Sequence, residues 1–91
     1  MDLKNWIHEA VVFIKTQPKQ KGYIGYETED YTILLMLQKS STDRYDFQLE
    51  KITCEEVFPY ESHCKRLAYN KDMTESQIVE YIKAKQFPYF E

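Results

Sequence analysis

Glycine and proline are scarce in this chain, and long apolar runs are missing. The 91 residues hold 2 Gly and 3 Pro, which leaves little room for the glycine-rich loops that cradle phosphate groups. The longest apolar run, Ile33 to Leu37, has the length of a strand and not the roughly 18 residues of a membrane span. The first residues show no basic stretch followed by an apolar block. We therefore expect no signal peptide, no membrane contact and a cytoplasmic protein.

Cysteine pairs at metal-binding spacing are also missing. The soft ligands are Cys54, Cys64, His8 and His63, and no Cys-x-x-Cys occurs. Adjacent His63 and Cys64 would point in different directions on either a helix or a strand. A thiolate–imidazole pair needs closeness in space, which adjacency in sequence does not supply. The sequence thus predicts reduced thiols, no metal, no cofactor and no catalytic residues, and we predict that the protein is not an enzyme.

The charge is unevenly distributed. The net charge is −3, but residues 22–62 carry nine acidic against three basic side chains, a net charge of −6. Binding to nucleic acid requires cations that neutralise phosphates, so this acidic middle disfavours nucleic acid as a partner. Tyr23, Tyr26 and Tyr31 near two lysines are the one feature in its favour, because aromatic rings on a strand can stack on bases. An acidic surface favours a basic partner.

Two helices are predicted, one near each end of the chain. Residues 2–16 carry an apolar stripe at helical spacing, with Asp2 as a cap. Val12 and Phe13 widen this stripe, so we expect the helix to pack into a groove. Residues 74–85 begin with a capping-box pattern, in which Thr74 is followed by Gln77 three positions later.

Three strands are predicted between the helices, at 23–27, 31–38 and 44–51. The second is apolar on both faces, and the third alternates with Tyr45, Phe47 and Leu49 on one face. Turns are expected at residues 28–30 and 39–43. Connections this short predict an antiparallel meander.

Residues 59–69 have two interpretations. In the first they form a short helix that begins with Pro59 and places Tyr60, Cys64, Leu67 and Ala68 on its inner face. In the second, residues 64–69 form a fourth strand. The spacing favours the helix.

The predicted fold is a single α+β domain over residues 1–91. A small antiparallel sheet of three strands, or four in the second interpretation, packs with the N-terminal and the C-terminal helix. The tail at residues 87–91 is too apolar to stay in water, so it packs back on the sheet or docks on a partner. The residues predicted for the core are Trp6, Ile7, Val11, Ile33, Leu35, Phe47, Leu49, Ile78 and Ile82.

Tyrosine is abundant. Eight Tyr and five Phe are more large rings than a small core needs, and tyrosine is enriched at protein interfaces. In size, acidity and lack of a catalytic signature the chain resembles small bacterial or phage inhibitor and immunity proteins. The leading hypothesis is a non-enzymatic protein-binding module of this inhibitor or immunity type, with a basic partner. The residues predicted to contact the partner are Asp46, Gln48, Glu50, Tyr23, Tyr26, Glu29 and Asp30.

Other function classes stay open at this stage. The main alternative is a homo-oligomer that binds a small ligand at the interface between its subunits. A small enzyme that uses Cys64 or the clustered carboxylates, and a nucleic-acid binder, are the less favoured classes.

Overall fold

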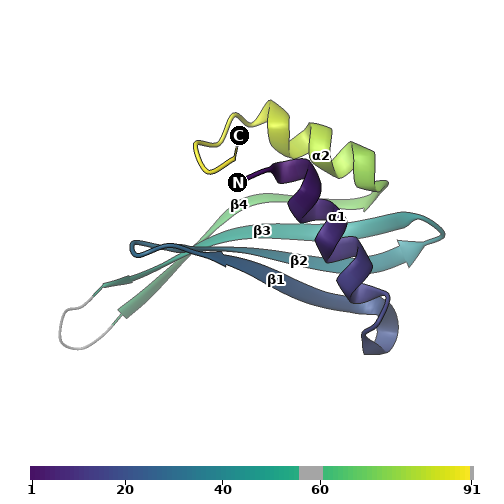
Figure 1. The fold of residues 1–91 in the computed structure, drawn as a ribbon, viewed down its shortest axis with the longest axis horizontal. Helices are drawn as coiled ribbons and strands as arrows, with labels where there is room; N and C mark the ends of the chain where they lie inside the picture. Colours follow the sequence, from purple (N-terminus) through teal and green to yellow (C-terminus); the bar gives the residue numbers. More distant parts are fainter. Residues whose placement is uncertain (56–60, 91) are drawn as a thin grey trace.

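Two helices lie on one side of a four-stranded sheet (Figure 1). The computed structural model describes the backbone of residues 1–55 and 61–90, and their side chains except at 54, 55 and 61–63. In chain order the elements are α1 (Leu3–Ile14), the short helix η1 (Pro18–Gln20), β1 (Lys21–Glu27), β2 (Thr32–Ser41), β3 (Arg44–Glu55), β4 (Glu61–Met73) and α2 (Glu75–Ala84). The fold class predicted from the sequence, α+β with a helix from each end of the chain, is confirmed.

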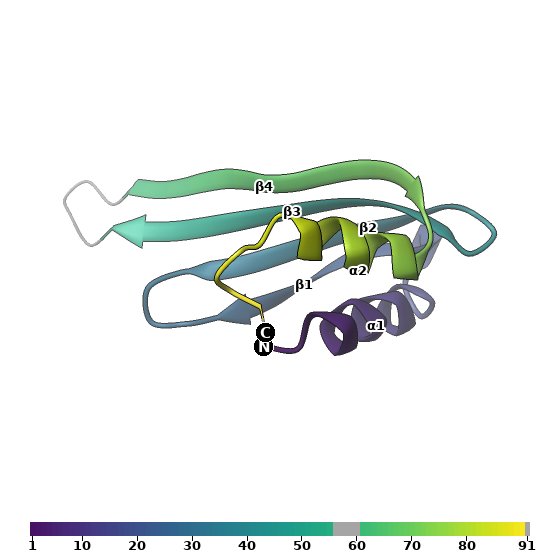
Figure 2. The ribbon, with the colours of Figure 1, turned by 90° about the horizontal axis from the view of Figure 1, so that it is seen from above.

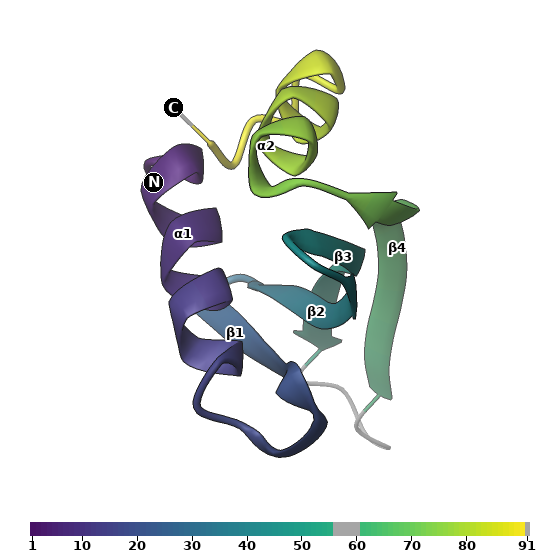
Figure 3. The ribbon, with the colours of Figure 1, turned by 90° about the vertical axis from the view of Figure 1, so that its right-hand side faces the viewer.

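The sheet is an antiparallel meander whose strand order, β1-β2-β3-β4, follows the chain (Figure 2). Residues directly opposite each other share a face. Ile24, Leu35, Leu49 and Ala68 form one such row on the side of the helices. Seen along the strands, both helices lie on this side (Figure 3), and the opposite side carries no element of the described chain. We call these two sides the helix face and the open face.

The core lies between the helix face and the two helices. Every residue predicted for the core is buried, and all belong to one cluster with Leu3, Ala10, Ile14, Leu37, Tyr45, Ala68 and Val79. None of the described polar or charged residues is buried. The alternation in β3 explains this separation, because Tyr45, Phe47 and Leu49 point at the helices while the residues between them point away.

Both helices begin at the predicted caps. The Asp2 side chain accepts a hydrogen bond from the Asn5 N–H, and Thr74 and Gln77 form the capping box. The prediction that Val12 and Phe13 belong to the buried stripe is wrong. They are 48% and 39% exposed, because the helix rests on a sheet that contacts one side of it and not in a groove. In the described chain no helix is long and apolar enough to cross a membrane.

The helix favoured for residues 59–69 is wrong from residue 61 on, since β4 runs over Glu61–Met73; residues 59 and 60 lie outside the described chain. Two register shifts interrupt the pairing of β3 with β4, one near Leu67 and one near Lys71 and Asp72. Each shift moves the following side chains to the other face. Leu67 and Ala68 therefore both lie near the core, although they are neighbours in the sequence. Two consecutive core residues are typical of a helix, so the sequence pattern favours a helix at this place.

The predicted turn at 39–43 is shorter than expected, because β2 continues to Ser41 and β3 begins at Arg44. Asp43 in this turn has a positive φ of 56°. The C-terminal tail packs back, as one of the two predicted alternatives has it. Phe87, Tyr89 and Phe90 are partly buried against the core.

Candidate functional site

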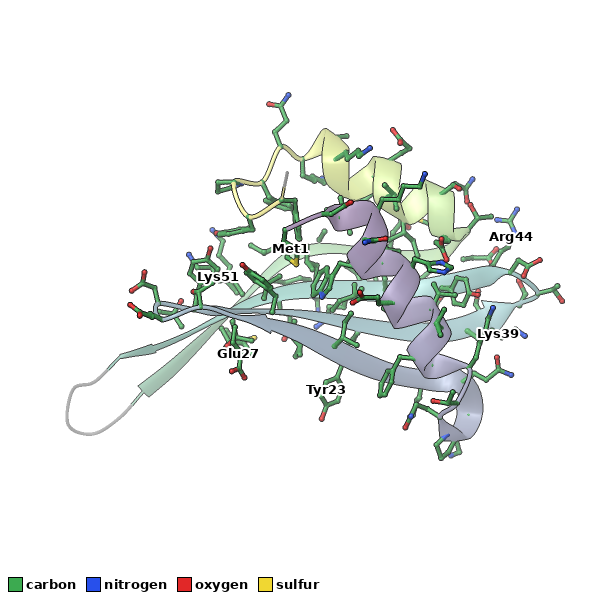
Figure 4. All side chains as sticks on the ribbon, viewed as in Figure 1. Met1, Tyr23, Glu27, Lys39, Arg44 and Lys51 are labelled. Carbon is green, nitrogen blue, oxygen red and sulfur yellow. The ribbon has the colours of Figure 1, made fainter. Side chains whose placement is uncertain are left out.

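The open face is the largest surface of the sheet that no described element covers. The register places these described residues on it: Lys21, Tyr23, Gly25 and Glu27 of β1, Thr32, Leu34, Met36 and Gln38 of β2, Asp46, Gln48, Glu50 and Ile52 of β3, and Cys64, Arg66 and Tyr69 of β4. Lys71 of β4 joins them through its contact with the Tyr69 ring. Tyr23 and Glu27 point away from the helices (Figure 4).

A row of exposed apolar side chains crosses the centre of the open face. Tyr23 lies opposite Met36, Met36 opposite Gln48, and Gln48 opposite Tyr69. The exposed fractions of Tyr23, Met36 and Tyr69 are 63%, 43% and 41%. Leu34, half-buried, extends the apolar area from Met36 along β2. A depression of about 860 Å³ lies along this row and continues past the start of β1 to Phe13 and Gln17.

The acidic residues predicted on β3 do lie on the open face, beside the apolar side chains of β2. Glu50 is opposite Leu34, and Gln48 is opposite Met36. The two acids, Asp46 and Glu50, already have hydrogen-bond partners within the chain. Asp46 accepts a hydrogen bond of 2.9 Å from the Asp72 N–H, and Glu50 accepts one from the Gln48 amide.

Basic residues of β4 lie next to these acids. The Arg66 guanidinium carbon is 5.2 Å, and the Lys71 Nζ 5.9 Å, from the centre of the Tyr69 ring. Arg66 is opposite Glu50, and the interaction with the Tyr69 side chain raises the pKa of Lys71. None of these three side chains is among the predicted site residues. Arg66 and Tyr69 fall in the helix favoured for residues 59–69, and Lys71 falls in a segment for which no helix or strand is predicted.

The other predicted site residues do not join this surface. Tyr26 lies opposite Ile33 and therefore on the helix face, where it is 40% exposed. Glu29 and Asp30 lie in the turn between β1 and β2, at the end of the sheet, and both are exposed. The odd spacing between Tyr23 and Tyr26 was already a signal, because residues an odd number apart on a strand point to opposite faces.

Cys64 is an exposed free thiol on the open face. Its Sγ donates a hydrogen bond to the Glu50 Oε2 over 3.1 Å. This bond and the nearby carboxylate charge raise the pKa of the Cys64 thiol, because both favour the protonated form. The arrangement is the opposite of the electropositive setting that activates a cysteine nucleophile.

The Glu50→Gln variant is therefore expected to make Cys64 more reactive. It removes the charge that favours the protonated thiol, so the pKa falls and the thiolate fraction at pH 8 rises. The check is the rate of iodoacetamide alkylation against pH in a Cys54→Ser background, with Glu80→Gln on α2 as the control of equal charge change. An alkylation profile identical to that of the background protein would contradict the role given to Glu50.

Among the described side chains, no three ligating residues come together in a way that could hold a metal ion. His8 Nδ1 lies 3.3 Å from a Glu75 carboxylate oxygen and links α1 to α2, so this histidine is far from the open face. The side chains of Cys54 and His63 lie outside the described residues. Comparison with family models, with curated proteins and with solved structures gives no match for this chain.

Proposed function

We propose that the protein is a non-enzymatic protein-binding module that engages another protein through the open face of its sheet. The observation that carries the proposal is the row of Tyr23, Met36 and Tyr69, each at least two-fifths exposed at the centre of an uncovered surface. Aromatic residues and methionine are enriched in interfaces. A sheet holds such side chains in fixed positions, which lowers the entropy lost when a partner binds.

The charges around this row support a partner of mixed charge. The described side chains of the open face comprise three bases, Lys21, Arg66 and Lys71, and three acids, Glu27, Asp46 and Glu50. The sequence predicts a basic partner from the acidic residues at 22–62, and Arg66 and Lys71 of β4 lie outside that range. We therefore propose a protein with an apolar patch ringed by charges of both signs, which is the usual composition of an interface with a polar rim. An inhibitor or immunity role fits this form of binding.

The experiment compares face variants in the same binding assay. The tagged protein is used to capture partners from its native host, and a partner that binds in stoichiometric amount is purified. Met36→Arg places a charge at the centre of the row, and Tyr69→Ala removes a ring from it. Each is expected to weaken binding at least tenfold in calorimetry, since truncation of a central aromatic residue commonly costs about 2 kcal/mol.

The matched control is Glu80→Arg on α2, an exposed position on the far side of the molecule. It should bind like the wild-type protein. Circular dichroism establishes that each variant is folded. A partner that binds Met36→Arg and Tyr69→Ala as tightly as the wild type would show that the open face is not the binding surface.

A further inference from the structure

β1 is an edge strand, and half of its backbone hydrogen-bonding groups face outward. In an antiparallel pair, residues alternate between bonding to the neighbouring strand and pointing away from it. The Thr28 N–H donates to the Tyr31 carbonyl over 2.8 Å, which fixes the alternation along the whole of β1. Gly22, Ile24 and Tyr26 thus bond to β2, and the outward groups belong to Lys21, Tyr23, Gly25 and Glu27.

The sequence of β1 complements itself when reversed. The strand reads Lys-Gly-Tyr-Ile-Gly-Tyr-Glu, and it begins and ends at equal distances from Ile24. In an antiparallel pair of two such strands centred on Ile24, Lys21 stands opposite Glu27, Gly22 opposite Tyr26, and Tyr23 opposite Gly25. Each glycine therefore meets a tyrosine, and each end joins a base to an acid.

We propose that β1 pairs with β1 of a second copy of this chain, about a two-fold axis through Ile24. The pairing joins the two four-stranded sheets into one sheet of eight strands. It is an isologous contact, in which the same surface of both copies is used. The inference rests on the edge strand alone and does not depend on the proposed function of the open face.

The backbone geometry agrees with this axis. The backbone N–H and C=O of Ile24 bond to β2. The two Ile24 residues therefore lie opposite each other as a pair without mutual hydrogen bonds. The outward residues on either side of it then fall opposite one another, Tyr23 with the partner's Gly25 and Lys21 with the partner's Glu27. Four pairs that each exchange two bonds give about eight backbone hydrogen bonds across the junction. A register moved by one residue would leave the outward groups of the two strands out of step.

The side chains also fit the proposed pair. They explain the presence of Gly25, which the fold of a single chain does not require. A Cβ added at Gly25 would meet its nearest neighbour at an ordinary 3.6 Å, and no glycine has a positive φ. Glycine is unfavourable within a strand unless an aromatic ring covers it from the neighbouring strand. In the proposed pair, the partner's Tyr23 supplies that ring.

On the helix face the pair accounts for exposed apolar residues near β1. A Cβ at Gly22 would lie 3.1 Å from the Phe13 ring, so this ring lies over Gly22 on the helix face. Tyr26 of the partner stands opposite Gly22 and therefore meets Phe13. Both rings are close to 40% exposed in the single chain. The two-fold axis is normal to the sheet, so α1 of both copies lies on the same side of it, next to the junction.

The first test is a charge exchange at the two ends of the junction. The wild-type protein is expected to sediment at twice the 11.0 kDa of one chain at micromolar concentration. Lys21→Glu puts two acids opposite each other at both ends, and it should raise the dimer dissociation constant about tenfold. The double variant Lys21→Glu, Glu27→Lys reverses both pairs and should return the constant to within about threefold of the wild type. Lys39→Glu, the same charge change on exposed β2, should leave it unchanged.

The second test reports the register. In a Cys54→Ser, Cys64→Ser background, Ile24→Cys places two thiols on the axis, where Cα atoms about 4.5 Å apart allow a disulfide. Mild oxidation should cross-link Ile24→Cys and not Tyr26→Cys, whose opposite residue is the partner's Gly22. Met36→Arg, which tests the proposed function, should still form the dimer.

Three outcomes overturn the inference. The first is a protein that stays monomeric at every concentration up to about 100 μM, although a small interface is expected to form in the micromolar range. The second is a rise in the dimer dissociation constant of Lys21→Glu that Glu27→Lys does not reverse. The third is a dimer that Met36→Arg abolishes. The last would assign self-association to the open face.

Discussion

Replacing Leu35 with alanine is expected to lower the free energy of unfolding by about 2–5 kcal/mol. Leu35 has no exposed surface and lies on β2 in the middle of the row that joins Ile24 to Leu49. The alanine leaves a cavity beneath both helices, which the strands on either side can fill only in part. For a domain whose total stability is about 5–15 kcal/mol, this is a large share.

Urea denaturation followed by circular dichroism measures the loss, at one dilute protein concentration so that association does not contribute. The matched control is Met36→Ala, one residue further along β2 and on the open face. It should change the stability by no more than about 0.5 kcal/mol. Equal losses in the two variants would contradict the assignment of β2 faces.

The double variant Tyr89→Ala, Phe90→Ala is expected to cost about 2–4 kcal/mol. The Tyr89 ring centre lies 5.2 Å from that of Tyr31 and beneath Lys51, and the Phe90 ring centre lies 5.8 Å from that of Trp6. These contacts hold the tail against α1 and the start of β2. Without them, partly buried apolar surface is opened to water.

Trp6 is the only tryptophan, so its fluorescence reports on the tail directly. Loss of the Phe90 ring should move the emission to longer wavelength in the folded protein, in parallel with the loss of stability in urea. Tyr69→Ala removes an aromatic side chain from the open face and should leave the emission unchanged. A double variant with the emission and stability of the wild type would show that the tail does not cover Trp6.

Much of the fold could be predicted because local patterns and tertiary packing agree. The alternation of Tyr45, Phe47 and Leu49 and the helical spacing in α1 and α2 each match the face that is buried. β4 could not be predicted in the same way. Its two register shifts put residues of both parities near the core, so a pattern with a period of two never develops.

The candidate site was predictable to the same extent. Asp46, Gln48 and Glu50 are predictable because they alternate with core residues, and Tyr23 because tyrosine is enriched at interfaces. Arg66, Tyr69 and Lys71 were missed, since their position depends on how β4 pairs with β3. The pairing of β1 with β1 of a second copy also produces no periodic pattern of apolar residues in the sequence. It depends on which residues stand opposite each other, and that requires the bounds of β1.

The contact of Trp6 with Phe90 also affects how the chain folds during synthesis. Neighbouring strands of the meander are neighbours in sequence, so the sheet can form as each hairpin leaves the ribosome. The apolar side of α1 emerges first, but the tail that covers Trp6 emerges last. At about 5–20 residues per second, the interval lasts several seconds. During that time the nascent chain exposes the apolar side of α1, to which chaperones can bind.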